Sequence, residues 1–281
     1  MPPDQTIGAA LDARERNLLD REKVSQSTRA RHDAWRVRAL QLGLLLILLV
    51  AWWGASGRLI DSLFVSDPVS VARTFVQIVV DGTLWWHLQQ TLIEMSAGYV
   101  LGVGIGIGLA IIVCGIPWGE MIARPFMLGL FAVPKVALAP IVIVLLGIYL
   151  APKIALSASL VLFIVYFNTV AGIDSVNPRM REILKVMGAS KFGILTKLTL
   201  PHAAPYIFTA MRITAPGALI GAIIGEFLSA NRGIGFFIAA ASSRYDTARV
   251  FAGILALLAF VLVLNALVTR LEARVSRWGP K

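Results

Sequence analysis

The sequence contains a single cysteine and three histidines among its 281 residues. Cys114 lies inside an apolar run, so the chain forms neither an internal disulfide nor a site in which several thiolates bind a metal. His32, His87 and His202 lie far apart and lack the spacing of metal ligands. These absences leave no candidate metal site, and we expect the chain to bind no metal.

Motifs for enzymatic chemistry are also missing. The sequence has no Gly-Lys dipeptide, which a phosphate-binding P-loop requires, and no Gly-x-Ser-x-Gly segment of a serine hydrolase. The segment GVGIGIG at 102–108 lacks the preceding strand and the spacing of a dinucleotide-binding loop. The loops between apolar runs are too short to fold a catalytic domain. We therefore expect no enzymatic activity and no cofactor on this chain, so uphill work would need an outside energy source.

Charged residues make up only 15% of the chain, whereas 57% of the residues are hydrophobic. A helix needs about 20 apolar residues to cross the roughly 30 Å of hydrocarbon in a bilayer. Six apolar blocks meet this need, at about 38–55, 92–115, 121–150, 153–174, 205–228 and 248–269. The third block is too long for one straight crossing and contains Pro134, Lys135 and Pro140, which predict a broken helix. The sequence therefore predicts an all-α integral membrane protein with about six transmembrane helices.

The net charge of +10 is distributed as a topology signal. Eight basic residues precede the first block, five lie between the fourth and fifth blocks, and four follow the last. The loop between the first and second blocks holds only two basic residues, and the loop between the fifth and sixth blocks holds three. By the positive-inside rule, both termini and residues 179–201 face the cytoplasm, with membrane lipid around the spans. This pattern accounts for the basic excess, so we expect no nucleic-acid partner.

The chain divides into a tail and one membrane domain. The first 35 or so residues are polar, and no small-residue cleavage site follows the first apolar block, so we predict no cleavable signal. Residues 1–37 are expected to form a cytoplasmic tail and residues 38–277 a transmembrane domain. Two of its spans carry glycines at every fourth position, which lie on one helix face: Gly98, Gly102, Gly106, and Gly217, Gly221, Gly225. These ladders fit close packing within the subunit, or else a subunit interface or a path that must close tightly.

The segment 179–201 has the pattern of two short helices joined by a turn. Met180, Ile183, Leu184 and Met187 recur at helical spacing and form one apolar face. Gly188 suits the left-handed conformation at a helix end. Ser190 can then cap a second short helix from about Lys191, with Phe192, Leu195 and Leu198 toward apolar surface. Pro201 suits the first turn of the next span.

This segment resembles the coupling motif of binding-protein-dependent ABC importer permeases: Glu-Ala-Ala, three residues, Gly, nine residues, Ile, one residue, Leu-Pro. Here it reads Glu182-Ile183-Leu184, Gly188, Leu198 and Leu200-Pro201, with larger apolar residues in place of both alanines. The resemblance extends from about residue 92 to 270. Over this range, the sequence is similar to the nitrate/sulfonate/taurine/bicarbonate branch of these permeases. The stretches that carry it are VPKVALAPIVIVLLGIY at 133–149, MRI at 211–213, GEFL at 225–228 and NRGIGFFI at 231–238.

The resemblance implies a type I importer permease fold with a cytoplasmic coupling helix, in a bacterial inner membrane. It implies a second copy of the chain, two cytoplasmic ATPase subunits that hold ATP and Mg, and an external or lipid-anchored substrate-binding protein. The coupling segment, residues 179–201, would contact the ATPase through these residues: Glu182, Ile183, Leu184, Gly188, Ala189, Ser190, Leu198, Leu200 and Pro201.

Polar residues within spans are candidates for the translocation pathway, because they are costly in lipid. They are Lys135, Tyr166, Asn168, Arg212 and Glu226, and Glu94 lies near the start of the second span. Buried cations favour a small anion such as a sulfonate, taurine or nitrate, although bicarbonate and a vitamin precursor stay open. The other interpretation is that Lys135 or Arg212 pairs with an acid or with helix carbonyls and never meets substrate.

Two other classes of protein fit the sequence less well than an importer permease. A stand-alone secondary transporter or channel would need two matching inverted halves and an ion relay, and neither is visible in the sequence. A membrane enzyme or assembly factor would need a catalytic constellation, which is missing. Neither class accounts for the coupling motif.

Overall fold

A computed structural model of the protein describes residues 35–59, 61 and 64–275. These residues form two compact units, one ending at Pro68 and the other beginning at Val69. The first unit contains the helix Trp35–Ala55, which is apolar and long enough to span a bilayer. The predicted tail, residues 1–37, lies almost entirely outside the described residues, as do residues 276 and 277 of the predicted membrane domain.

The second unit is helical and begins with α2, whose first residue lies at the boundary. Its helices are α2 (Pro68–Val80), α3 (Thr83–Gly115), α4 (Gly119–Ala132), α5 (Lys135–Leu146), α6 (Leu150–Asp174), α7 (Pro178–Val186), α8 (Lys191–Ile194), α9 (Leu200–Ser229), α10 (Ile234–Ser243) and α11 (Thr247–Val275). In the described part of the chain, five helices are long and apolar enough to cross a membrane, and the bent pair α4–α5 makes a sixth. This confirms the prediction of about six spans.

The broken third span is also confirmed. Helices α4 and α5 meet at a bend of 93°. Val133, which separates them, has an extended backbone with ψ 127°, as expected for a residue before proline. Pro140 lies inside α5 without ending it, so Pro134 marks the break.

The span that follows the coupling segment differs in part from the expectation. Pro201 lies in the first turn of α9, as predicted. We also predicted that the second short helix is separate from this span. Instead, helix runs without interruption from Lys191 to Ser229. A turn of π-helix, Leu195–Thr199, joins α8 to α9. A π-helical turn changes which backbone groups bond to one another. Here the turn ends at Thr199, two residues before Pro201, which has no backbone N–H to donate.

Glycines of the two neighbouring helices α3 and α9 pack against helix α6. On α3, a Cβ added at Gly102 or at Gly106 would lie 2.7 Å from a carbonyl oxygen of α6. On α9, a Cβ at Gly221 would lie 2.5 Å from Ser157 Cα, and one at Gly225 2.9 Å from Lys153 Cα. Only glycine permits such close approach. Packing within the subunit is therefore the correct interpretation for both ladders, except at Gly217, where nothing lies within 4 Å.

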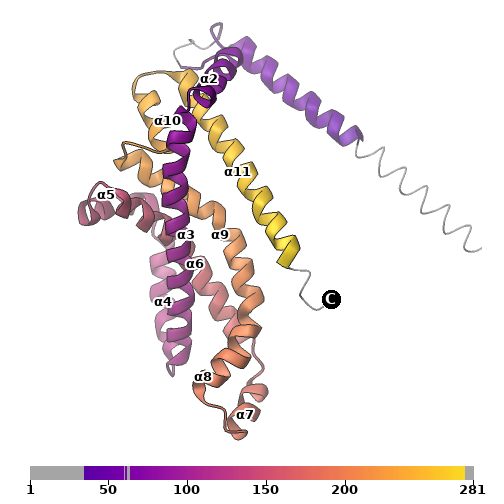
Figure 1. The fold of residues 1–281 in the computed structure, drawn as a ribbon, viewed down its shortest axis with the longest axis vertical. Coiled ribbons are helices and arrows are strands. Elements are labelled where there is room, and N and C mark those ends of the chain that lie inside the picture. Colours follow the sequence, from indigo (N-terminus) through magenta and orange to yellow (C-terminus); the bar gives the residue numbers. More distant parts are fainter. Residues whose placement is uncertain (1–34, 60, 62–63, 276–281) are drawn as a thin grey trace, which may run out of the picture. The chain divides into compact units, whose positions relative to one another are not determined.

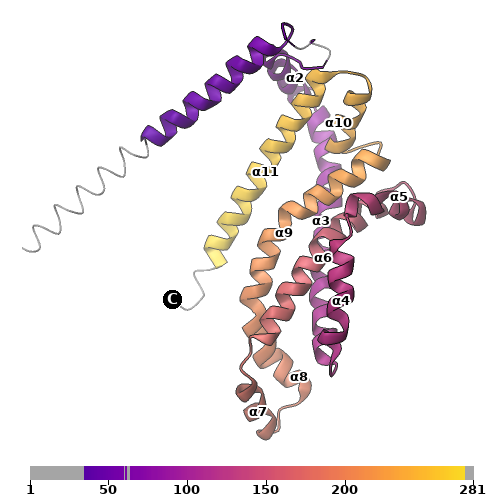
Figure 2. The ribbon, with the colours of Figure 1, turned by 180° about the vertical axis from the view of Figure 1, so that it is seen from behind.

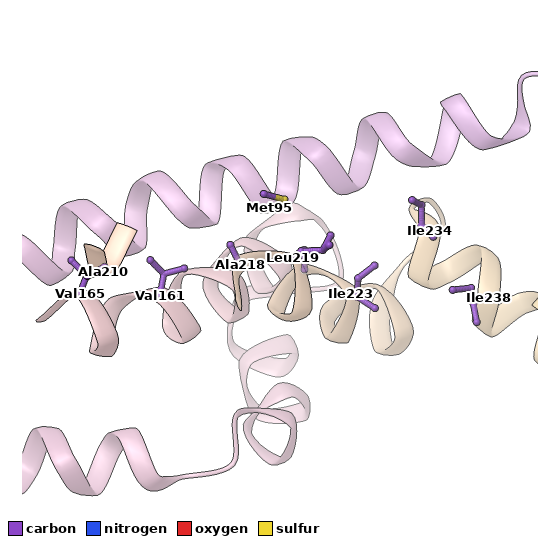
Figure 3. Close-up of a cluster of buried hydrophobic side chains, with 10 residues drawn as sticks. Met95, Val161, Val165, Ala210, Ala218, Leu219, Ile223, Ile234 and Ile238 are labelled. Carbon is purple, nitrogen blue, oxygen red and sulfur yellow. The ribbon is translucent and has the colours of Figure 1, made fainter. Parts of the chain in front are cut away.

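The hydrophobic core of the second unit lies where α3, α6, α9 and α10 meet. Figure 3 shows Met95 of α3 beside Ala218 and Leu219 of α9, with Val161 and Val165 of α6 toward one end of the row and Ile234 and Ile238 of α10 at the other. Large side chains alternate with alanines such as Ala218 and Ala222, so the helices approach closely. The core thus fixes α10, which the sequence analysis did not predict, against the spans.

The two ends of the second unit differ in structure. Helices α7 and α8 lie together at one end, and α10 lies at the opposite end beside the start of α3 (Figures 1 and 2). The candidate functional residues fall into two groups that follow this division.

Candidate functional site

The coupling segment folds as two capped helices around a glycine turn. The Asn177 side chain accepts a hydrogen bond of 2.9 Å from Arg179 N, and Pro178 occupies the first turn of α7. Gly188 has a φ of +79°, which lets Ala189 N donate back to Leu184 O at 2.9 Å. These contacts confirm the predicted helix and its end at Gly188.

The second helix is capped as the sequence predicted. Gly193 N donates to Ser190 Oγ at 3.1 Å, which fixes the start of α8. Both helix starts are therefore held by side chains, and the turn between them by backbone hydrogen bonds. The segment has a defined shape although it stands at the end of the unit (Figure 1).

The apolar face of the coupling segment is exposed. Ile183 is 58% exposed, and Met180 and Met187 are exposed beside it, whereas Leu184 is half-buried. Of the three residues expected to face apolar surface, Leu195 and Leu198 are half-buried, whereas Phe192 is 73% exposed. Helix α8 is a single turn, and it buries Ile194 instead.

The other predicted coupling residues surround this face. Glu182, Gly188, Ser190 and Pro201 are exposed, and Ala189, Leu198 and Leu200 are half-buried. The half-buried leucines belong to the π-helical turn and the first turn of α9, where they anchor the segment to the span. All the predicted residues therefore lie in the stretch from α7 to the first turn of α9.

Lys135 lies at the 93° bend and is bonded to the end of α4. Its Nζ donates to the carbonyl oxygens of Leu130, Phe131 and Val133 at 2.5, 3.3 and 3.1 Å. It also lies 4.6 Å from the centre of the Phe163 ring. The last carbonyls of a helix lack partners and attract a cation. This geometry matches the structural alternative that the sequence left open for Lys135.

The remaining pathway candidates are spread over two helices. On α6, Asn168 donates to Ile164 O of its own helix at 2.8 Å, and Tyr166 is buried with no hydrogen-bond partner for its hydroxyl among the described residues. On α9, Arg212 is exposed and Glu226 is buried, about four turns away. The structure therefore does not gather the five candidates into one site.

A second group of residues lies toward the α10 end and forms a buried charge cluster: Glu94, Lys153 and Glu226. Their exposed fractions are 0%, 3% and 1%. Lys153 Nζ lies 3.2 Å from Glu94 Oε1. Glu226 accepts hydrogen bonds from Thr91 Oγ1 at 2.7 Å and from Gly235 N at 2.6 Å. The cluster thus joins α3, α6, α9 and the start of α10.

Sequence reasoning missed Lys153 and Thr91 in this cluster. Lys153 stood at the predicted edge of the fourth apolar block and was taken as its boundary, but α6 begins at Leu150 and encloses it. A lysine followed at once by an unbroken apolar run is the signal that a boundary charge lies inside a span. Thr91 carries no such signal, because threonine is common in spans.

The comparisons with known proteins agree with this architecture. Residues 102–277 match the family "binding-protein-dependent transport system inner membrane component". The formylaminopyrimidine transport permease protein ThiX of Halalkalibacterium halodurans is 30% identical over 248 residues, which cover 87% of this chain and 98% of that protein. The taurine transport system permease protein TauC of Escherichia coli is 29% identical over 273 residues, covering 93% and 97%.

A solved structure shows the same fold. A bacterial ABC transporter involved in the import of the acidic polysaccharide alginate aligns with a TM-score of 0.58 at 17% identity, over 86% of this chain and 96% of that chain. The resemblance carried by Glu182, Gly188 and Leu200-Pro201 is thereby confirmed at the level of the family. The chain belongs to the binding-protein-dependent inner-membrane permeases of ABC importers, in the nitrate/sulfonate/taurine branch.

Proposed function

We propose that two copies of this chain form the translocation pathway of an ATP-driven importer, and that each couples to a cytoplasmic ATPase subunit through the coupling segment. ATP and Mg are bound by the ATPase, and an external binding protein delivers the substrate. The observation that carries the proposal is the exposed apolar face of α7, held in shape by Asn177, Gly188 and Ser190. An exposed apolar patch on a fixed element is typical of a protein interface.

The connections of the coupling segment suit the transmission of movement. At one end, Ser175 N bonds to Ala171 O and only a few residues separate α6 from α7. At the other end, helix continues from Lys191 into α9. A displacement of α7 and α8 would therefore act on α6 and α9. These two helices pack closely against each other at Gly221 and Gly225.

We propose that the coupling segment and both termini face the cytoplasm. Five basic residues of the segment, and those at both ends of the chain, support this orientation through the positive-inside rule. The α10 end would then face outward, toward the binding protein.

We propose a small organic or inorganic anion, such as a sulfonate, taurine or nitrate, as the substrate. The taurine permease TauC, which aligns with 93% of this chain, supports this class. Arg212 is an exposed cation on α9. Selection among substrates would rest largely with the binding protein.

Co-purification with the ATPase subunit tests the coupling proposal. Ile183→Asp places a charge on the exposed apolar face of α7 and should abolish recovery of the ATPase without lowering the melting temperature. Ile116→Asp is the matched control, because Ile116 is 54% exposed and lies in the turn after α3, outside the coupling segment. Full recovery of the ATPase with Ile183→Asp would refute the assignment.

A second variant tests the shape of the segment. Gly188→Pro forces a negative φ on a residue that requires +79°, so it should uncouple ATP hydrolysis from transport in a reconstituted complex. Normal coupled transport by this variant would mean that the turn at Gly188 is not needed.

A further inference from the structure

The charge cluster contains one more negative group than positive groups. Glu94 and Glu226 are carboxyl groups, Lys153 is the one lysine, and all three are enclosed by the fold. The helix contacts bring the two acids into one cluster. Glu94 lies three residues after Thr91, which bonds to Glu226, and Glu226 follows Gly225, which packs against Lys153. Two ionised carboxylates close together and out of water repel each other strongly, and one lysine balances only one of them.

The hydrogen-bond donors around the two carboxyl groups are unequally shared. Each oxygen of Glu226 receives a donor, Oε1 from Thr91 Oγ1 and Oε2 from Gly235 N. Glu94 Oε1 receives Gln90 Nε2 at 2.8 Å and faces Lys153 Nζ at 3.2 Å. Glu94 Oε2 is buried and has no partner among the described residues. Among the described residues, it is the one oxygen of the four that receives no hydrogen-bond donor.

We propose that Glu94 and Glu226 form a proton-binding site, in which one proton on Glu94 Oε2 is shared with the Glu226 carboxylate at neutral pH. The cluster then holds one neutral acid, one carboxylate and one ammonium group, with no net charge. Each donor in the cluster then has an acceptor: Glu94 donates to Glu226, and Lys153 and Gln90 donate to Glu94. This inference concerns the folded chain itself and does not depend on the proposed transport function.

Among the residues that the structure describes, no second cation is buried beside the cluster. Among the neighbouring described residues, His87 of α3 accepts a hydrogen bond from Gly233 N at 3.1 Å, which engages its Nδ1. Arg232 lies on the exposed side, with its guanidinium 3.5 Å from the centre of the Trp86 ring and its Nε bonded to Trp86 O. Helix α10, which closes the cluster with Gly235, carries no titratable side chain. Lys153, which pairs with Glu94, is therefore the buried positive group of the cluster among the described residues.

The shared proton holds together parts of the chain that are far apart in sequence. Ile234 N donates to Thr91 Oγ1 at 3.0 Å, and Thr91 donates on to Glu226. A Cβ at Gly233 would overlap the Glu226 carboxyl, and one at Gly235 would lie 2.9 Å from Glu226 Oε2, so the chain wraps tightly around this group. Loss of the proton at high pH would leave an unbalanced negative charge in the charge cluster. Repulsion within the cluster would then loosen α10 from α3 and α9.

Infrared spectroscopy of the full chain in lipid nanodiscs tests the proposal directly. A protonated carboxylic acid has a C=O stretching band that ionised carboxylates lack and that shifts in D₂O. At neutral pH, we expect this band in the wild type and its loss in Glu94→Gln. Absence of the band from the wild type, or its persistence in Glu94→Gln, would overturn the assignment.

A comparison of two conservative variants gives a second readout. In Glu94→Gln, the new NH₂ takes the place of the protonated Oε2 and still donates to Glu226, so the melting temperature should match the wild type at neutral pH and fall less at high pH. In Glu226→Gln, the NH₂ must face either Thr91 or Gly235, both of which donate, so the melting temperature should fall. Equal losses in the two variants would contradict the proposed position of the proton.

Discussion

Lys153 of α6 and Glu94 of α3 form an ion pair of 3.2 Å inside the helix bundle, with both side chains enclosed by the fold. The aliphatic stem of the same lysine lies against Gly225 of α9, where a Cβ would come within 2.9 Å of Lys153 Cγ. One residue therefore connects three spans, through its charge on one side and its stem on the other. Such a pair acts on stability mainly when one partner is lost.

Removal of the Lys153 charge should destabilise the folded chain. Lys153→Met keeps the stem against Gly225 but leaves the carboxyl groups of Glu94 and Glu226 without a cation. Loss of one partner from a buried ion pair costs about 3–5 kcal/mol. We expect a clear fall in melting temperature in detergent.

The double variant Lys153→Met, Glu94→Gln provides the control for this change. It removes one acid together with the lysine, so part of the lost stability should return. An unchanged melting temperature in Lys153→Met would mean that the ion pair does not contribute to folding.

The contact between α3 and α6 predicts opposite effects for two glycines close together on one helix. Gly102→Ala adds a Cβ 2.7 Å from Ala158 O and from Val161 Cβ, and overpacking of this kind costs about 1–3 kcal/mol. Gly104→Ala is the matched control, because nothing lies within 4 Å of its added Cβ. Alanine favours a helix over glycine by up to about 1 kcal/mol.

Thermal unfolding of the two variants in detergent measures this difference. We expect a lower midpoint for Gly102→Ala and an unchanged or higher midpoint for Gly104→Ala. If both substitutions shifted the midpoint in the same direction by the same amount, the packing of α3 on α6 would not have the geometry described above.

Lys135 should act on the stability of the bend rather than on substrate binding. Lys135→Met leaves the carbonyl oxygens of Leu130, Phe131 and Val133 without their donor, and a hydrogen bond to a charged group contributes about 1.5–3 kcal/mol. The midpoint of unfolding should fall, while KM for transport stays constant. Lys135→Arg keeps a cationic donor and should restore most of the stability.

The opposite result would favour the pathway interpretation of Lys135. A normal unfolding midpoint combined with a raised KM in Lys135→Met would show that the lysine meets the substrate.

Features that depend on neighbouring residues were predictable from the sequence. The spans follow from the length of the apolar blocks, and the bend follows from Pro134, because proline acts on the residue directly before it. The turn at Gly188 and the cap at Ser190 were likewise predictable, since each is made within six residues of chain. The exposure of Phe192 was not, because it depends on how far α8 extends.

By itself, the sequence determined that the chain is a helical membrane permease with a capped, exposed coupling segment. Only the tertiary structure decided that Lys135 binds the carbonyls of α4, that the glycine ladders close on α6, and that Lys153 meets Glu94. The physical reason is the relative placement of the helices. Thr91 and Glu226 are separated by 135 residues, and their meeting depends on the axial rotation and sliding of two spans, which hydropathy and periodicity leave undetermined.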